Sequence, residues 1–149
     1  MLSSLAREGG RHMKRGTLLH PELSRVIASL GHGDSLVIAD AGLPIPAAVE
    51  RIDLAFAPGK PAFMDVLEAV LAEMEVERAI LAQEVKSASA VFHERLQGRL
   101  ASLPRIRARG VEVVSHDELK RLSQGARAAV RTGEFTPYAN IVLFSGVVF

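Results

Sequence analysis

Five side chains of this sequence have the types and positions that acid–base chemistry or hydrogen bonding to hydroxyl groups needs. They are His32, Asp40, His116, Tyr138 and Asn140. Histidine exchanges a proton near neutral pH, a carboxylate accepts hydrogen bonds, and phenol and carboxamide groups are neutral hydrogen-bonding partners. The set favours a neutral polyhydroxylated ligand over a phosphate, and it contains no nucleophile with a base beside it in sequence.

The two histidines are expected at opposite ends of helices. His32 follows Gly31, just beyond a predicted helix, where the carbonyl end of the helix favours a protonated imidazole. His116 lies at the start of a later predicted helix, where the amide end favours a neutral imidazole. If both reach one pocket, His32 is suited to act as the acid and His116 as the base. The alternative, that each is only a surface or capping residue, stays open.

Asp40 directly follows a short apolar segment, Ser35 to Ala39, which we predict to be a buried strand. Ligands of α/β proteins tend to bind at the carboxyl ends of strands, so Asp40 is a candidate ligand-binding residue. An Asp before Ala-Gly also commonly holds a turn, and that interpretation remains open. Tyr138 and Asn140 are two residues apart near the last predicted strand, which would place them on the same face. The alternative for Tyr138 is a residue that covers the edge of the core.

The sequence gives no sign of a metal or a cofactor. His20 and His93 are the other candidate ligands, but no pair has the His-x-x-x-His spacing and the chain contains no cysteine. Gly31 and Gly33 lack the third glycine of a dinucleotide-binding motif, since Leu36 stands in its place. We therefore expect a protein that works without either.

The pattern of apolar residues predicts alternating helices and strands. Helices are expected at 21–30, from 61 to 74 and at 88–100, and from a Ser115–Glu118 capping box with a further turn at 126–131; strands are expected at 35–39, 51–56, 78–83, 111–114, 139–144 and at the extreme end, 147–149. This alternation indicates a three-layer α/β/α single domain with a mostly parallel or mixed central sheet.

Composition narrows the classes of partner. The 149 residues carry 18 Lys and Arg against 17 Asp and Glu, a balance that argues against nucleic-acid or anionic-membrane binding. No apolar segment is long enough to span a bilayer, and the absence of cysteine fits a cytoplasmic protein. Because Met13-Lys14-Arg15-Gly16 looks like a second start, we expect residues 1–12 to be a flexible extension and residues 13–149 to form the domain.

Six stretches of the sequence resemble the family of ribose pyranases and L-fucose mutarotases. They are residues 13–17, 30–34, 40–46, 51–54, 61–63 and 137–141. The resemblance extends from Met13 to Phe149 and so covers nearly the whole chain.

The resemblance implies an isomerase that equilibrates the ring forms of a free sugar without metal or cofactor. By motif position it implies that His32 is the proton donor, and that the sugar is contacted by Asp40, His116, Tyr138, Ala139 and Asn140. It also implies a ring of identical subunits, a homodecamer, with active sites shared between neighbours.

The loop after Asp40 resembles the ribose branch of that family. It has the sequence Ala-Gly-Leu-Pro-Ile-Pro. In fucose mutarotases the corresponding segment is similar to Asp-Ala-His-Phe-Pro instead. The resemblance thus implies interconversion of the β-pyranose and β-furanose forms of D-ribose, which supplies ribose for catabolism. A mutarotase for another sugar such as L-fucose, or a non-catalytic sugar-binding accessory protein, remains an alternative.

Overall fold

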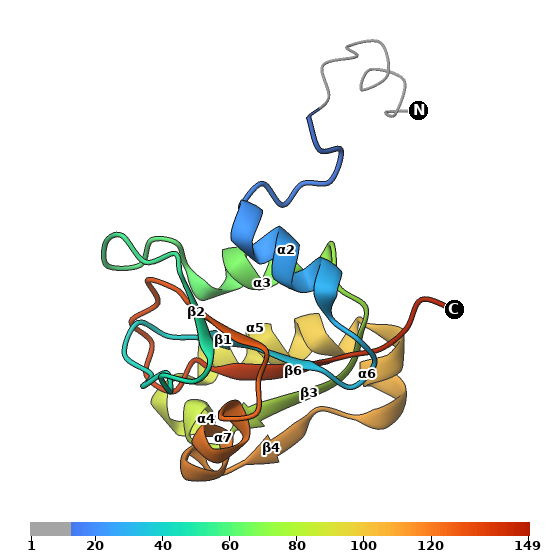
Figure 1. Cartoon of the computed structure of the whole chain (residues 1–149). Helices are drawn as coiled ribbons and strands as arrows, with labels where there is room; N and C mark the ends of the chain where they lie inside the picture. The colour runs from blue at the N-terminus through green and yellow to red at the C-terminus, as the bar shows by residue number, and fades with distance from the viewer. Residues whose placement is uncertain (1–12) are drawn as a thin grey trace.

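The centre of the molecule is a six-stranded mixed sheet with helices on both faces (Figure 1). The computed structural model describes residues 13–149, and the predicted extension, residues 1–12, lies outside them. The strands lie in the order β2-β5-β1-β6-β3-β4. Only β6 runs antiparallel to its neighbours, β1 and β3, while the other adjacent strands pair in parallel. The predicted α/β class with a mixed sheet is confirmed.

The elements follow one another along the chain in the order α2 (Pro21–Ser29), β1 (Ser35–Ala39), β2 (Glu50–Asp53), α3 (Phe63–Leu71), β3 (Val76–Ala82), α4 (Glu84–Ala88), α5 (Ala90–Ala101), α6 (Pro104–Arg109), β4 (Glu112–Val114), α7 (His116–Ser123), β5 (Ala128–Arg131) and β6 (Ile141–Ser145). No helix of this part of the chain is long and apolar enough to cross a membrane.

Alternate residues of the central strands point to opposite faces of the sheet and pack into two apolar cores, one on each face. One core packs Leu36 and Ile38 of β1 against α2, α3, α5 and α6. The other packs Val37 and Ala39 against Leu119 of α7 and the loop between β1 and β2. Figure 1 shows α2 and α3 on one side of the sheet and α7 on the other. All five residues of β1 are buried, and all but Ser35 are apolar, as expected for a strand covered on both faces.

Several local predictions agree with the structure. Strand β1 has the predicted bounds, and α2 begins at Pro21, where the missing N–H costs no helical hydrogen bond. The Ser115 side chain accepts a hydrogen bond from the Glu118 N–H at 3.1 Å, as the capping box predicts.

The prediction of a helical turn at 126–131 is wrong. Residues 128–131 form strand β5, which lies between β1 and β2 and pairs with both in parallel. Alanine favours a helix in isolation, but here Ala128, Ala129 and Val130 are buried within the sheet, and tertiary packing overrides that preference.

Other boundaries also differ from the predictions. Helix α6 was not predicted, and α4, which begins at Glu84, precedes α5 where a single helix at 88–100 was expected. The predicted strand at 147–149 is not one, since β6 ends at Ser145.

Polar residues lie at both ends of the strands, and we call these two ends of the sheet its edges. Strands β1, β2, β3, β4 and β5 all end at the edge where β6 begins. This carboxyl edge carries Asp40, Arg131 and the 138–140 segment. The opposite edge carries His32, Glu77 and the C-terminal residues.

Candidate functional site

Asp40 is held in place by Asn140 at the carboxyl edge of the sheet. The Asp40 N–H donates to Asn140 Oδ1 at 2.8 Å, and Asn140 Nδ2 donates to Asp40 Oδ2 at 3.4 Å. The other carboxylate oxygen, Oδ1, accepts from the Gly42 N–H at 3.0 Å. The turn-holding contact therefore exists, and Asp40 also lines two pockets, so its two interpretations are compatible.

Asn140 is only 1% exposed. Its amide oxygen and its amide nitrogen each make a hydrogen bond to Asp40. In this structure Asn140 fixes the carboxylate rather than opening onto a pocket.

His116 forms another side of the site. Its backbone N–H donates to both carboxylate oxygens of Glu84, at 2.9 and 3.2 Å, so the first turn of α7 is tied to the first turn of α4. Its ring packs edge-on against the ring of Tyr138, with centroids 4.9 Å apart and an interplanar angle of 78°. Among the described residues, His116 Nδ1 is a buried side-chain atom with no hydrogen-bond partner. Such an atom normally has a partner, which here a bound hydroxyl group or water can supply.

Tyr138 does not lie on a strand, so the prediction that it shares a strand face with Asn140 is wrong. Its backbone is left-handed, with φ of 63°, and β6 begins only at Ile141. Ala139, which follows, is fully buried, and its N–H donates to the Thr136 carbonyl at 3.3 Å. The tight turn nevertheless brings the Tyr138 ring to His116.

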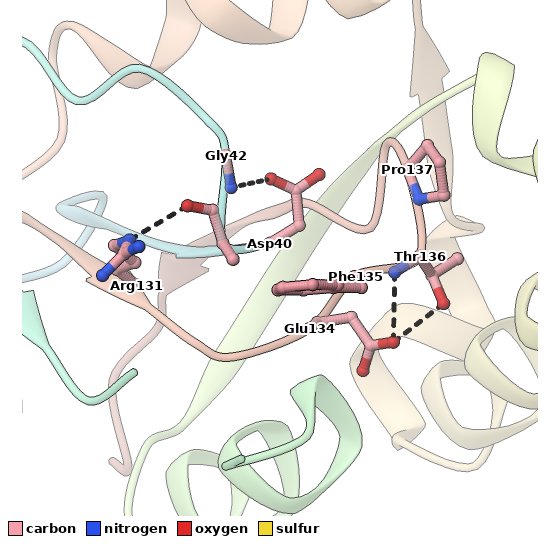
Figure 2. A pocket seen from close by; sticks show the side chains of 8 residues that line it. Asp40, Gly42, Arg131, Glu134, Phe135, Thr136 and Pro137 are labelled. Carbon is pink, nitrogen blue, oxygen red and sulfur yellow. Dashed lines mark hydrogen bonds between the residues drawn. The ribbon is translucent and has the colours of Figure 1, made fainter. Parts of the chain in front are cut away.

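These side chains border a pocket of about 230 Å³. It is lined by Asp40, Gly42, Leu43, Pro44, His116, Pro137 and Tyr138. A second pocket of about 430 Å³ adjoins it across Asp40, and Figure 2 shows this second pocket with Phe135 and Pro137 beside Asp40. The site combines a carboxylate, an imidazole and a phenol, which suits a ligand with several hydroxyl groups.

Arg131 was not recognised from the sequence. Its Nε donates to the Ala41 carbonyl at 2.9 Å, and its Nη1 lies 3.1 Å from each carboxylate oxygen of Asp53 (Figure 2 shows the contact to Ala41). The guanidinium therefore holds the loop after Asp40 instead of offering an anion site. No local signal pointed to it, because its place at the end of strand β5 follows from the pairing of that strand with β1 and β2.

His32 lies apart from these residues. Its Nε2 donates to the Glu77 carboxylate at 3.0 and 3.1 Å, and its side chain is 61% exposed. Gly33, Asp34 and strand β1 separate it from Asp40. At about 3.3 Å per residue, the five residues of β1 alone place the two edges about 16 Å apart. The structure therefore brings Asp40, His116, Tyr138 and Asn140 together and leaves His32 at the opposite edge.

No group of three or more His, Cys, Asp or Glu side chains within residues 13–149 has the arrangement of a metal site. Near the pocket, Asp40 accepts from the backbone of Gly42 in the following loop, and Glu84 accepts from the backbone of His116 at the start of α7.

The fold and the pocket define a class: a small α/β protein with a mixed six-stranded sheet and a polar pocket at its carboxyl edge. The model of the RbsD / FucU transport protein family matches residues 13–148, and the chain belongs to that family.

Named relatives refine this assignment. A D-ribose pyranase of Variovorax paradoxus is 58% identical over 139 residues, which cover 92% of this chain and all of the relative. The structure of Bacillus subtilis RbsD complexed with D-ribose is similar, with a TM-score of 0.84, 43% identity, and coverage of 92% of this chain and 100% of that one. FucU from Bifidobacterium longum is more distant, with a TM-score of 0.75, 25% identity, and coverage of 87% and 95%.

Proposed function

We propose that this protein interconverts the β-pyranose and β-furanose forms of D-ribose, and so acts as an isomerase that needs no cofactor. The observation that carries the proposal is the pocket of Asp40, His116 and Tyr138 in a chain that is 58% identical to a D-ribose pyranase. The product ring form would supply ribose for catabolism.

The reaction breaks and forms one bond between carbon and oxygen. In the pyranose, the C1–O5 bond breaks while O5 takes up a proton and the anomeric hydroxyl loses one, which gives the open aldehyde. After rotation about the carbon chain, O4 bonds to C1 and loses its proton, and the carbonyl oxygen gains one. Atoms balance without an oxidant or a metal, and the protein has to deliver and accept protons near neutral pH.

The side chains at the carboxyl edge are suited to binding the sugar. Asp40 accepts hydrogen bonds from sugar hydroxyls, and Asn140 holds its carboxylate in place. Tyr138 contributes a hydroxyl group, and His116 Nδ1 is available to a ligand. Ala139 contributes through the backbone of the turn that presents Tyr138.

His32 is the proposed proton donor, and it would come from a second copy of the chain. The support is its separation from Asp40 within one chain, along the length of β1, together with its exposure. A neighbouring copy that presents its His32 edge to the Asp40 edge completes the site. We propose a homodecameric ring in the cytoplasm on the family resemblance, and light scattering on the purified protein measures the size of the assembly.

A mutarotase for another sugar such as L-fucose is the second candidate. The loop from Ala41 to Pro46 favours ribose, as does the greater identity to the RbsD protein complexed with D-ribose than to FucU. A non-catalytic sugar-binding protein is the third candidate, and it would bind ribose without exchanging its ring forms.

Saturation-transfer NMR on equilibrated D-ribose tests the proposal. Irradiating the β-pyranose anomeric proton should reduce the β-furanose signal when the protein is added, and the effect should persist in EDTA. L-Fucose anomers measured in parallel should exchange more slowly. Binding of ribose without transfer, or faster exchange of fucose, would overturn the assignment.

A further inference from the structure

Glu134 lies in the loop between β5 and β6, and its carboxylate accepts three hydrogen bonds. Its Oε1 accepts from the Phe63 N–H at 3.0 Å, and its Oε2 accepts from the Thr136 N–H at 3.3 Å and the Thr136 hydroxyl at 2.8 Å. Figure 2 shows the two contacts to Thr136.

One of these contacts takes the place of a helix cap. The N-cap residue of α3, Ala62, has no side chain that can accept a hydrogen bond. Glu134 reaches the free N–H of Phe63 from a position 71 residues further along the chain and brings a negative charge to the amide end of the helix. The loop that carries Glu134 is thereby fastened to α3.

The contacts to Thr136 fix the turn that presents Tyr138. The Thr136 carbonyl accepts from Ala139, and within that turn Tyr138 adopts its left-handed backbone. This conformation is unfavourable for a residue with a side chain and persists only where the surroundings hold it. Glu134 is the charged side chain that ties this turn to a regular element.

The backbone of Glu134 reaches the other half of the pocket. Its carbonyl accepts from the Ala41 N–H at 2.9 Å, and its own N–H donates to the Thr132 hydroxyl at 3.1 Å. That hydroxyl donates to the Ala39 carbonyl at 2.8 Å. Ala39 and Ala41 flank Asp40, so one residue joins the backbone around Asp40 to the turn around Tyr138.

We propose that Glu134 is a positioning residue, which sets the placement of Tyr138 relative to Asp40 through its carboxylate. The proposal rests on the proposed function for its catalytic consequence. Its structural part, that the Glu134 carboxylate determines the surroundings of Tyr138, stands independently.

The chain offers a direct probe, because Tyr138 is its only tyrosine and it has no tryptophan. Tyrosine emission and its quenching by acrylamide therefore report on Tyr138 alone. In Glu134→Gln one oxygen becomes an NH₂ group, which cannot accept from Phe63 or Thr136, so the turn loses part of its anchor. Acrylamide quenching should then increase, and ribose exchange should slow about tenfold, within the roughly 100-fold loss that a 1 Å displacement can cause.

Ser89→Ala is the matched control. Ser89 caps α5 by accepting from the Phe92 N–H at 3.2 Å. Helix α5 is not the helix that Glu134 caps, and none of its residues line the pocket. Loss of the Ser89 cap should lower the urea midpoint of unfolding, as the loss of the α3 cap does, while tyrosine quenching and ribose exchange stay at wild-type values.

The coupling between Glu134 and Tyr138 is measured with a double variant. If Glu134 acts through the tyrosine, Glu134→Gln combined with Tyr138→Phe should slow exchange by less than the product of the two single effects. Unchanged quenching in Glu134→Gln, equal changes in Ser89→Ala, or multiplicative slowing would each overturn the proposal. A wild-type protein without ribose exchange would instead refute the proposed function, and the quenching comparison would still decide whether Glu134 places Tyr138.

Discussion

The carboxylate of Asp40 is oriented before any ligand arrives. Asn140 contacts it from a buried position and the Gly42 N–H fixes one of its oxygens. Groups fixed in this way need no reorganisation when a ligand binds, which favours both binding and catalysis. At the scale of single residues, the pocket is therefore built around Asp40, with His116 and Tyr138 beside it.

Tyr138→Phe separates the phenol hydroxyl from the ring. The ring contact with His116 is kept, so the fold should be unchanged. Losing a hydrogen-bonding partner of the sugar should cost about 1–3 kcal/mol in transition-state stabilisation. The exchange rate of ribose, measured against pH, should fall while the shape of the curve stays the same, because the proposed role of the phenol is to hold the sugar and not to transfer a proton. Loss of an ionisation near neutrality would assign Tyr138 to proton transfer instead.

His32→Ala should abolish ribose exchange and leave the free energy of unfolding nearly unchanged. The side chain is exposed, and its hydrogen bonds go to Glu77 alone. His93→Ala is the control, since His93 lies on α5 and should be dispensable for exchange. Normal exchange in the His32 variant would remove it from the reaction.

At the scale of elements, the sequence predicted what local signals specify. The Pro21 start of α2, the apolar run of β1 and the Ser115 cap of α7 were all predicted because each depends on neighbouring residues. Strand β5 could not be predicted in this way, since Ala-Ala-Val-Arg becomes a strand only through its pairing with β1 and β2.

The residues of the site likewise differ in whether local sequence signals predict them. Asp40 and His116 were predicted at ends of elements, and the structure places them there. The contributions of Arg131 and Glu134 depend on contacts with Ala41, Asp53 and Phe63, which are far away in the sequence. The left-handed backbone of Tyr138 likewise has no local signal in a residue other than glycine.

Gly133→Ala should destabilise the loop that carries Glu134. A Cβ atom at Gly133 would lie 2.5 Å from the Lys60 carbonyl oxygen and 2.6 Å from the Lys60 nitrogen, and backbone atoms cannot rotate away. The expected loss is about 1–3 kcal/mol in the free energy of unfolding, as for overpacking in a core. Urea denaturation measures it.

Gly98→Ala is the matched control for that substitution. Gly98 lies within α5, and no atom outside the adjoining turns of that helix lies within 4 Å of the added Cβ, so alanine should stabilise the helix by about 0.5–1 kcal/mol. Equal effects of the two substitutions would show that the close approach of Lys60 to Gly133 has no energetic weight.

A cross-strand pair on β3 and β4 gives a pH-dependent contribution to stability. Arg78 Nε and Nη2 donate to the two carboxylate oxygens of Glu112, at 2.7 and 2.9 Å. These hydrogen bonds, helped by the charges of Arg78 and Arg109, lower the pKa of Glu112 from its ordinary value of 4.5. A folded-state pKa below the unfolded value stabilises the protein above pH 4.5, and this contribution is lost as the pH falls through the folded-state pKa.

Glu112→Gln should therefore lower the free energy of unfolding at pH 7 and matter less in acid. Both side chains are about one-third exposed, and solvent screening limits the loss at neutral pH to about 0.2–1 kcal/mol. Urea denaturation of both proteins at pH 7 and at pH 3 measures the difference. A difference that grows on acidification would contradict the assigned direction.

At the scale of the whole molecule, the sheet separates the two groups of residues that we propose to form one site. The carboxyl edge holds Asp40, His116 and Tyr138, and the opposite edge holds His32 with Glu77 and the exposed C-terminal residues. A sugar of pentose size cannot contact both edges of one chain across about 16 Å of strand. Two copies placed edge to edge bring the two groups together, as the proposed ring requires.

Complementation between two inactive variants tests this account most directly. His32→Ala and Asp40→Asn are produced together with different affinity tags, and mixed assemblies are purified through both tags. A site that takes Asp40 from one copy and His32 from its neighbour should regain about a quarter of the wild-type ribose exchange in randomly mixed assemblies, because each wild-type residue is present with a probability of about one half. Each variant assembled alone should remain inactive. Inactive mixed assemblies, or a fully active wild-type monomer, would contradict a site shared between two copies.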